Sequence, residues 1–295
     1  MYKVTSRWPH QDSIKIEWNI GKRCNYDCSY CPSSIHDNTS PHTDIEILKS
    51  TIDKLMLLGK PIRLSFTGGE PCIHPQFSEL IRYARQTGIS WISVTTNGTQ
   101  KFELYESLAI DQLVVSIHLE YRWSRIFNTF SRIAKLASTK VIAQIMAHHN
   151  YIQDAQKLCH QCTVEKIPYT VRRIRWTTGD QDSFDDSRYN HADLAWIKDM
   201  ESTVEANCVI DDNVQFHAND IIKLHLNKYK DWVCSAGIES LMINWDGNVH
   251  RATCRVGGSI GNIYEDSFLT PREPVICDRT FCTCASDIPL TKYRK

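Results

Sequence analysis

Residues 22–34, KRCNYDCSYCPSS, place three cysteines within eight residues, at Cys24, Cys28 and Cys31, with no fourth cysteine nearby. Four thiolates would close a structural metal site, whereas three leave one coordination position free for chemistry. With this C-x3-C-x2-C spacing, one loop can bind three irons of a cubane 4Fe–4S cluster and leave the fourth iron open. The stretch therefore predicts a reactive iron–sulfur site. The alternative is a zinc site completed by a histidine such as His36.

The sequence around this loop alternates between strand-like and helix-like segments from residue 13 to about residue 205. Six segments of four to nine residues are rich in β-branched and aromatic side chains, which is typical of strands. They are SIKIEWNI, IRLSFT, WISVTT, QLVVSIHL, KVIAQIMA and PYTVRRIRW.

The segments between these strands show helical periodicity. In DIEILKSTIDKLMLLG, an apolar residue recurs at every third or fourth position, which makes one apolar stripe. Thr43 and Glu46 predict a capping box at its start, and Gly59 predicts its end. The other helical segments are PQFSELIRYARQTG, RWSRIFNTFSRIAKLAS and DAQKLCHQCT.

Six successive βα units predict an α/β fold with a parallel sheet and right-handed crossovers. Six units are too few to close an eight-unit barrel, so we expect an open, partial (β/α)6 TIM-like barrel. Its active site is expected at the C-terminal ends of the strands. The three-cysteine loop directly follows the first strand and therefore lies at that end.

The overall composition is that of an ordinary globular protein. Basic and acidic residues both number 34, so the net charge is zero, which argues against a nucleic-acid partner bound by a strong basic field. The N-terminus lacks the apolar region of a signal peptide, and no apolar run is long enough to cross a bilayer. We expect a cytoplasmic protein without a membrane partner, in which the 12 cysteines are metal ligands or buried thiols rather than disulfides.

The pattern changes after residue 205. SLMINWDGNVHRATC reads as a β-hairpin with Asp246 and Gly247 at its turn. Five cysteines gather in this last part, at Cys234, Cys254, Cys277, Cys282 and Cys284. Residues 179–190, GDQDSFDDSRYN, are acidic and predict a solvated loop, with a lid over the substrate as the alternative.

Three features together resemble the radical S-adenosylmethionine (SAM) enzymes. These are the cysteine spacing with Tyr30 before the last cysteine, the GGE of SFTGGEP (65–71), and polar residues at the ends of the third and fourth strands. The resemblance covers residues 13 to about 205. It implies a 4Fe–4S cluster on Cys24, Cys28 and Cys31, with SAM chelating the open iron.

The resemblance also implies which residues contact the bound SAM. Glycines after the second strand would let the backbone approach SAM closely. The segment carrying them meets the methionyl amino group in the family, and residues at the fourth strand end contact the ribose or carboxylate. The candidate SAM-binding residues are Tyr30, Gly68, Gly69, Glu70, Thr96, Asn97, Ser116, His118 and Arg173; no catalytic side chain is assigned beyond the cluster and SAM.

The C-terminal cysteines resemble the twitch module, a shorter relative of the SPASM domain. The resemblance rests on a cysteine before and after the hairpin, Gly-Asn-Ile at 261–263, and a terminal cysteine group. It implies a radical SAM core over residues 1–222 and an auxiliary module over 223–295, a small β-hairpin/helix module with a second 4Fe–4S cluster. Four of the five cysteines would suffice, and the sequence leaves open which four. A structural zinc ribbon is the alternative.

The implied reaction is reductive cleavage of SAM to a 5′-deoxyadenosyl radical that abstracts hydrogen from a substrate C–H bond. An external donor such as flavodoxin or ferredoxin would supply the electron. An auxiliary cluster could then accept an electron from the substrate radical, which favours oxidation of a small molecule. The alternatives are radical modification of a ribosomally made peptide or protein and a non-enzymatic electron carrier. Only 12 residues precede the first strand, so we expect no leader-binding domain of the kind that many peptide-modifying members carry.

Two further features stay open at this point. Arg173 and Arg175 alternate on one face of the sixth strand and could meet an anionic substrate or a structural carboxylate. Cys159 and Cys162 form a C-x2-C pair on an expected outer helix, where inert thiols or a further metal or redox role are both compatible with the sequence.

Overall fold

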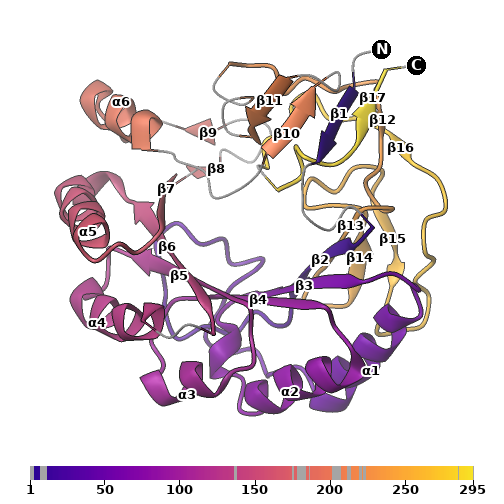
Figure 1. Cartoon of the computed structure of the whole chain (residues 1–295), viewed down its shortest axis with the longest axis horizontal. Coiled ribbons are helices and arrows are strands. Elements are labelled where there is room, and N and C mark those ends of the chain that lie inside the picture. Colours follow the sequence, from indigo (N-terminus) through magenta and orange to yellow (C-terminus); the bar gives the residue numbers. More distant parts are fainter. Residues whose placement is uncertain are drawn as a thin grey trace.

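The computed structural model describes residues 3–6, 12–135, 138–174, 176–177, 184–185, 187–200, 207–210, 214–218, 221, 224–284 and 286–294. Six parallel strands form an arc (Figure 1) and pair in chain order. All six strand predictions are confirmed, and the partial TIM-like barrel with them. The strands are β2 (Ile14–Asn19), β3 (Ile62–Thr67), β4 (Trp91–Thr96), β5 (Gln112–His118), β6 (Lys140–Ala147) and β7 (Tyr169–Arg173).

Helices cover the outer face of this arc (Figure 1). The four predicted helices are present, and two further helices, α3 and α6, were not expected. Two short 3-10 turns, Pro71–Ile73 and His149–Tyr151, follow β3 and β6. The helices are α1 (Ile45–Met56), α2 (Phe77–Thr87), α3 (Phe102–Ser107), α4 (Trp123–Ala134), α5 (Ile152–Val164) and α6 (His191–Met200).

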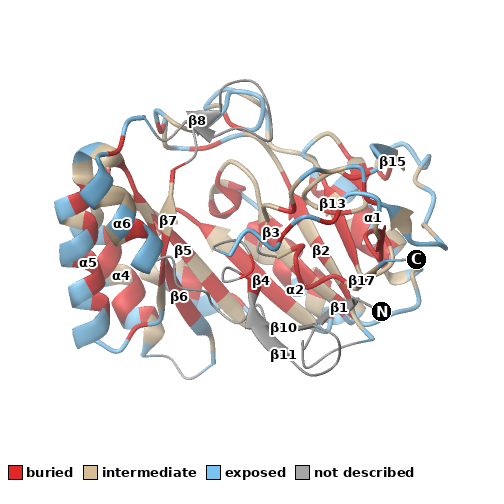
Figure 2. Cartoon of the chain, turned by 90° about the horizontal axis from the view of Figure 1, so that it is seen from above, coloured by how far each residue is buried: buried red, intermediate tan, exposed pale blue. Residues whose placement is uncertain are grey.

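The two faces of the arc differ in polarity. Buried and half-buried residues alternate along the strands (Figure 2). The buried residues that face the helices are apolar, as in the row Trp18, Phe66 and Val94, which lie at paired positions of three strands. Burying each such side chain contributes roughly 1.5–3 kcal/mol. The inner face carries polar residues instead, such as Asn19 and Thr67. The helices therefore stabilise the outer face, and the inner face is left available for a ligand.

The strand register also decides where the arginines of β7 point. Met146 pairs with Arg172, and His118 pairs with Met146, so Arg172 shares the inner face with His118. Arg173 instead pairs with Ala147, which packs in the core under the helices. The register therefore favours Arg172 for contact with a ligand, and contact by Arg173 stays a prediction. Arg175 and half of the acidic segment 179–190 (residues 179–183 and 186) lie outside the described residues.

The predicted capping box at α1 is wrong by one residue. The N-cap is Asp44, whose carboxylate accepts from the backbone N–H of Glu46 at 2.7 Å. The hydroxyl of Thr43 instead donates to the carbonyl of Ile20 at 2.8 Å, which connects the start of the helix to the end of β2. Gly59 has the left-handed φ of 66° expected just beyond a helix end.

A second sheet lies beside the barrel (Figure 1) and joins the two ends of the chain. The N-terminal strand β1 pairs with strands from residues 207–210 and 292–293. Segments on both sides of residue 222 therefore share a sheet, and the boundary between two domains at that position stays a prediction. The strands are β11 (Val214–His217), β10 (Asn207–Ile210), β1 (Lys3–Ser6), β17 (Lys292–Tyr293), β12 (Val233–Cys234) and β16 (Val275–Ile276); β8 (Trp176–Thr177) and β9 (Phe184–Asp185) form a separate pair.

The predicted hairpin is confirmed, and it extends the barrel sheet. β13 (Ser240–Ile243) and β14 (Asn248–His250) flank the Asp246-Gly247 turn, and β15 (Ser259–Asn262) follows. β13 pairs in parallel with β2, so the sheet runs without interruption from the barrel into the C-terminal module. The part of the module described over 224–284 and 286–294 consists of strands and turns. No described helix has the length and apolar character needed to span a membrane.

We expect Asp44→Ala to lower the free energy of unfolding by about 1 kcal/mol, because the first turn of α1 loses its capping acceptor. Asp44→Asn is the matched control, since the amide oxygen can still cap. Urea unfolding followed by circular dichroism measures both. Equal stability of Asp44→Ala and Asp44→Asn would contradict the assignment of the cap.

Candidate active site and a second cysteine centre

The three-cysteine loop docks on the end of β3 through its backbone. Gly69 N–H donates to the carbonyl of Gly21 at 2.8 Å, and Glu70 N–H donates to the carbonyl of Arg23 at 2.9 Å. A Cβ atom on Gly69 would lie only 2.2 Å from the carbonyl oxygen of Lys22. The glycine is therefore required because the loop passes against it, which is a different reason from the close approach to SAM inferred above.

A buried carboxylate connects this turn to the next strand end. Glu70 accepts from the backbone N–H of Asn97 at 2.5 Å, from the hydroxyl of Thr96 at 2.7 Å and from the backbone N–H of Cys72 at 2.9 Å. Burial raises the pKa of Glu70, and these donors oppose that rise. Glu70 and Thr96 thus position the strand ends, and their direct contact with SAM stays a prediction.

Asn97 extends the same network to the cysteines. Its amide Nδ2 donates to Asn25 Oδ1 at 2.8 Å and lies 3.9 Å from Cys24 Sγ. The Cys24 sulfur also accepts from the backbone N–H of Tyr26 at 3.4 Å. Hydrogen bonds to cysteine sulfurs are one of the means by which proteins tune iron–sulfur clusters. The structure therefore brings Asn97 to the cysteine loop, and its contact with SAM stays a prediction.

The far end of the loop is held by residues that follow β5. Ser29 N–H donates to the carboxylate of Glu120 at 3.0 Å, and Asp27 N–H donates to the hydroxyl of Tyr121 at 2.6 Å. The ring of Tyr121 stacks on that of Tyr26, with centroids 3.7 Å apart. Sequence analysis did not single out Glu120 and Tyr121. Their position immediately after the fourth predicted strand, at the end where the active site is expected, was the feature of the sequence that could have identified them.

His118 lies against the loop as well. Its Nδ1 is 2.5 Å from the hydroxyl of Tyr30 and 3.4 Å from Cys28 Sγ. Burial lowers the pKa of His118 to about 4, so the ring is neutral at neutral pH. Burial also raises the pKa of Tyr30, so its hydroxyl keeps its proton at neutral pH. Ser116, two residues earlier on the same face, accepts from Gln144 at 3.3 Å.

The three thiols are buried or half-buried, and burial raises their pKa values, for Cys28 to about 12 and for Cys31 to about 11. Metal binding would deprotonate them. Among the described residues, no group of three or more histidine, cysteine or acidic side chains converges on a single ion. His36, the proposed zinc ligand, hydrogen-bonds instead to the carbonyl of Tyr26 at 2.5 Å. Three soft ligands spread along one loop fit a cluster better than one zinc ion.

A further buried acceptor lies at the same strand ends. Asn19 Oδ1, at the end of β2, is buried and has no hydrogen-bond partner among the described residues. An unsatisfied buried acceptor is rare and indicates a partner such as a ligand donor or water. Asn19 was not singled out in the sequence. These residues fit a cluster on Cys24, Cys28 and Cys31 with an amine-bearing ligand beside it.

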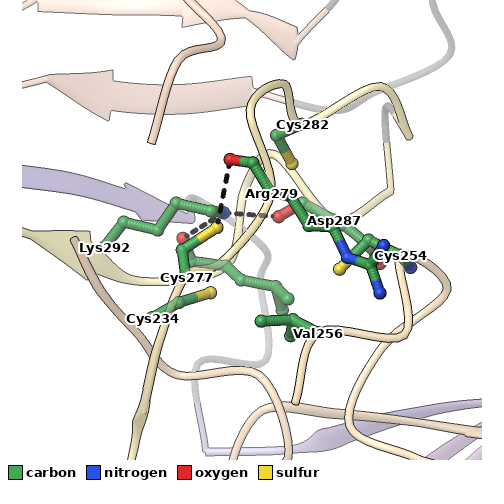
Figure 3. A pocket seen from close by; sticks show the side chains of 9 residues that line it. Cys234, Cys254, Val256, Cys277, Arg279, Cys282, Asp287 and Lys292 are labelled. Carbon is green, nitrogen blue, oxygen red and sulfur yellow. Dashed lines mark hydrogen bonds between the residues drawn. The ribbon is translucent and has the colours of Figure 1, made fainter. Parts of the chain in front are cut away.

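The C-terminal cysteines form a second centre in which four of the five face one cavity (Figure 3). The fifth, Cys284, does not line this cavity. Its thiol lies 2.9 Å from the hydroxyl of Ser286, and the residues acting on it include Lys15 and Glu17 of β2. The four cysteines that line the cavity are Cys234, Cys254, Cys277 and Cys282.

Two charged side chains share this cavity. Asp287 accepts from the backbone N–H of Cys254 at 2.9 Å. Lys292 is almost completely buried, and its Nζ donates to the carbonyls of Asp287 and Ile288 at 2.6 and 3.0 Å. Burial by itself would lower the pKa of Lys292, yet Cys282, Cys234 and Asp287 raise it, and the net pKa lies above its ordinary value.

Four soft ligands facing one cavity, with a buried cation beside them, fit an anionic cluster of four irons. The carboxylate of Asp287 lines the same cavity and is a further negative group that acts on the buried ammonium. Gly261 and Asn262, part of the resemblance to the twitch module, serve the hairpin itself. Asn262 donates to the carbonyl of Asp246 at 2.9 Å, and a Cβ on Gly261 would meet the carbonyl of Ser267.

The remaining cysteine pair shows the properties of inert thiols. Cys159 and Cys162 are buried on α5, within the core that packs against the sheet. Burial raises both pKa values to about 12, so neither is a ready thiolate. Cys72 is likewise buried, under the GGE turn.

The loop and the strand ends form one candidate site, and comparison with known proteins shows what it resembles. A family model described as the Radical SAM superfamily matches residues 18–135. This part of the chain, which includes the three-cysteine loop and the GGE turn, is therefore similar to that superfamily.

Three curated relatives illustrate the sequence similarity. The chain is 33% identical over 89 residues to the S-adenosylmethionine-dependent nucleotide dehydratase of Selenomonas ruminantium, covering 30% of this chain and 31% of that protein. It is 36% identical over 85 residues to the Fe-coproporphyrin III synthase of Methanosarcina barkeri, covering 28% and 21%. It is 36% identical over 89 residues to the GTP 3′,8-cyclase of Chlorobaculum tepidum, covering 30% and 26%. The matched stretches thus span a fifth to a third of these relatives.

Two solved structures show the similarity of fold. The enzyme anSMEcpe with bound AdoMet superposes with a TM-score of 0.60 at 15% identity, over 86% of this chain and 79% of that one. SuiB of Streptococcus suis, bound to S-adenosylmethionine, gives a TM-score of 0.58 at 14% identity, over 86% and 64%. Both cover more of this chain than the family model does, so the likeness of fold extends beyond residues 18–135.

We expect Gly69→Ala to lower the free energy of unfolding by about 3 kcal/mol and to displace the cysteine loop, because a backbone carbonyl cannot rotate away from the new methyl group as a side chain could. Gly21→Ala is the matched control, since nothing lies within 4 Å of its added Cβ. Thermal unfolding and the iron content after anaerobic reconstitution measure the effect. Retention of full iron content by Gly69→Ala would contradict the docking described here.

We expect Cys282→Ala to lose the iron bound by the C-terminal module and Cys284→Ala to keep it. Both variants are made in a protein whose Cys24, Cys28 and Cys31 are already alanine, so that only the second centre contributes. Iron and sulfide assays after anaerobic reconstitution then decide between the two cysteines. Iron loss in Cys284→Ala with retention in Cys282→Ala would overturn the assignment of ligands.

Proposed function

We propose that this chain is a radical SAM enzyme that oxidises a small-molecule substrate, with an auxiliary 4Fe–4S cluster as the one-electron acceptor. The observation that supports this most strongly is the four-cysteine cavity. A cluster with a cysteine for each iron has no open position at which substrate could coordinate. Electron transfer is then the function left for it.

Cys24, Cys28 and Cys31 would hold the first cluster, which would supply the electron for reductive cleavage of SAM and so the radical that abstracts a hydrogen atom from a substrate C–H bond. The resulting substrate radical loses one electron and one proton to become the oxidised product, for example a carbonyl from an alcohol. Cys234, Cys254, Cys277 and Cys282 would hold an auxiliary cluster that could accept this electron. In the first turnover an oxidised auxiliary cluster would take the one electron that the substrate radical loses, so atoms and charge balance without a further oxidant.

The chain's own residues would hold and orient these groups. Asn19 Oδ1 is placed to accept a hydrogen bond from the amino group of SAM, because it is buried at the strand ends and lacks a partner among the described residues. His118, neutral and held by Tyr30, keeps one flank of the loop fixed. Arg172 shares the inner face with His118 and suits an anionic group on the substrate. Fixed positions of this kind let a reactive radical meet one C–H bond rather than many.

Peptide modification is the second candidate. Solved structures with this fold include anSMEcpe with a bound Kp18Cys peptide and SuiB bound to the precursor peptide SuiA. These likenesses, at 15% and 14% identity, support the fold and leave the substrate open. The polar inner face of the arc would accommodate either a small polar molecule or one residue of a peptide.

We expect anaerobically reconstituted protein to bind about eight irons per chain, and the Cys24/Cys28/Cys31→Ala variant about four, because each cubane cluster holds four. With SAM, a strong reductant and the correct substrate, the wild type should release 5′-deoxyadenosine together with a product lighter by two hydrogens. Mass spectrometry of candidate alcohols and of short peptides separates the two substrate classes. About four irons falling to near zero, or a product of unchanged mass, would contradict oxidation through an auxiliary cluster.

A further inference from the structure

The buried ammonium of Lys292 is the feature of the second centre that cluster binding alone does not explain. A cluster needs only its four cysteines. Lysine is rarely buried completely unless it is paired. Lys292 is 2% exposed, and the groups that act on it electrostatically are the carboxylate of Asp287 and the thiols of the cavity. Its position is therefore maintained by the surrounding structure at a cost, which indicates a purpose for the charge.

The surroundings of Lys292 fix the cation in place. Its Nζ donates to three carbonyls, of Asp287, Ile288 and Leu290, at 2.6, 3.0 and 3.1 Å. The ring of Tyr229 lies on another side, with its centroid 5.2 Å from Nζ. The carbonyls use all three N–H donors, so the ammonium cannot rotate to follow a ligand and acts as a fixed positive charge (Figure 3).

The same charge lines the cavity of the four cysteines. Lys292 and Asp287 both belong to its lining, and Lys292 acts electrostatically on Cys234 and Cys282. A 4Fe–4S cluster with four thiolates is an anion, and reduction adds one more negative charge. In a buried site of low dielectric constant, a fixed cation beside the cluster stabilises the reduced state more than the oxidised state.

We propose that Lys292 is a positioning residue that raises the reduction potential of the auxiliary cluster and so makes it an acceptor for the substrate's electron. This inference rests on the proposed function, because it requires a cluster on Cys234, Cys254, Cys277 and Cys282. Asp287 opposes it: its carboxylate lines the same cavity with the opposite charge. The balance of these two side chains sets the electrostatic field at the cluster.

The test is a potentiometric titration followed by electron paramagnetic resonance, in full-length protein carrying Cys24/Cys28/Cys31→Ala so that only the auxiliary cluster gives a signal. Lys292→Gln removes the charge and keeps N–H donors for the carbonyls. At a fixed potential near the midpoint, we expect it to lower the ratio of reduced to oxidised cluster at least tenfold, equivalent to 59 mV for a one-electron couple. Lys230→Met, an exposed lysine of the same module, is the matched control and should leave the ratio unchanged.

A second variant keeps the proposal testable if Lys292→Gln does not fold. Asp287→Asn removes the opposing charge, and its amide oxygen can still accept from Cys254 N–H; it should shift the ratio in the opposite direction. A ratio within twofold of the parent protein in either charge variant, with about four irons retained, would overturn the role of Lys292 while leaving the proposed function intact. Absence of iron in the parent Cys24/Cys28/Cys31→Ala protein would instead overturn the auxiliary cluster itself.

Discussion

The backbone contact between the glycine turn after β3 and the loop after β2 is the constraint on which the first site depends. Two N–H groups of the turn, at Gly69 and Glu70, bind two carbonyls of the loop, and the missing side chain of Gly69 allows the approach. These two backbone hydrogen bonds hold the loop over the strand ends without a side chain taking part. Glu70 then ties the same turn to the end of β4, and Asn97 carries the connection to Cys24. The position of the thiols is thus a consequence of strand pairing.

The pairing of β13 with β2 extends the same principle to the second centre. β2 leads into the three-cysteine loop at its C-terminal end, and β13 follows Cys234 in the chain and runs parallel to β2. Contacts across this junction are specific: Lys54 of α1 donates to the carbonyl of Ile263 at 2.6 Å, and the indole of Trp18 donates to the hydroxyl of Tyr264 at 3.3 Å. The barrel sheet that leads into the three-cysteine loop thus continues into the module, where Cys254 follows β14 of that sheet and Cys234 lies on β12 of the second sheet.

The strands and their order were predictable because each is a short apolar run in a regular βα series, and burial on the helix side demands such runs. The hairpin was predictable from Asp246-Gly247. The short helix α3 was missed because its six residues have too few turns to show a period. At the start of α1, Thr43 and Asp44 are both good capping residues, and tertiary contact with Ile20 decided between them.

What the sequence left open at the sites depends on three-dimensional information that spacing does not carry. Alternation along β7 showed that neighbouring arginines face opposite ways, but only the register with β6 showed that Arg172 faces inward. The C-x-C spacing of Cys282 and Cys284 left both as possible ligands, and the path of the chain turned Cys284 toward β2. The sequence did not indicate that Lys292 is buried, because a lysine near a chain end is usually solvated. Its burial depends on three carbonyls that folding brings together.

The electrostatic surroundings of the two centres differ in one respect: a buried cation, Lys292, lines the second centre and offsets the carboxylate of Asp287 that lines it too. The charged side chains other than thiols that act on Cys24, Cys28 and Cys31 are carboxylates, from Glu70, Glu120 and Asp27, and His118 beside them is neutral. Negative surroundings disfavour an added electron and make a cluster a stronger reductant, as cleavage of SAM requires. At the second centre the fixed cation of Lys292 faces Cys234 and Cys282 and favours the added electron. Two clusters of the same composition would then differ in potential because of the charges folded around them, the first suited to giving an electron and the second to taking one.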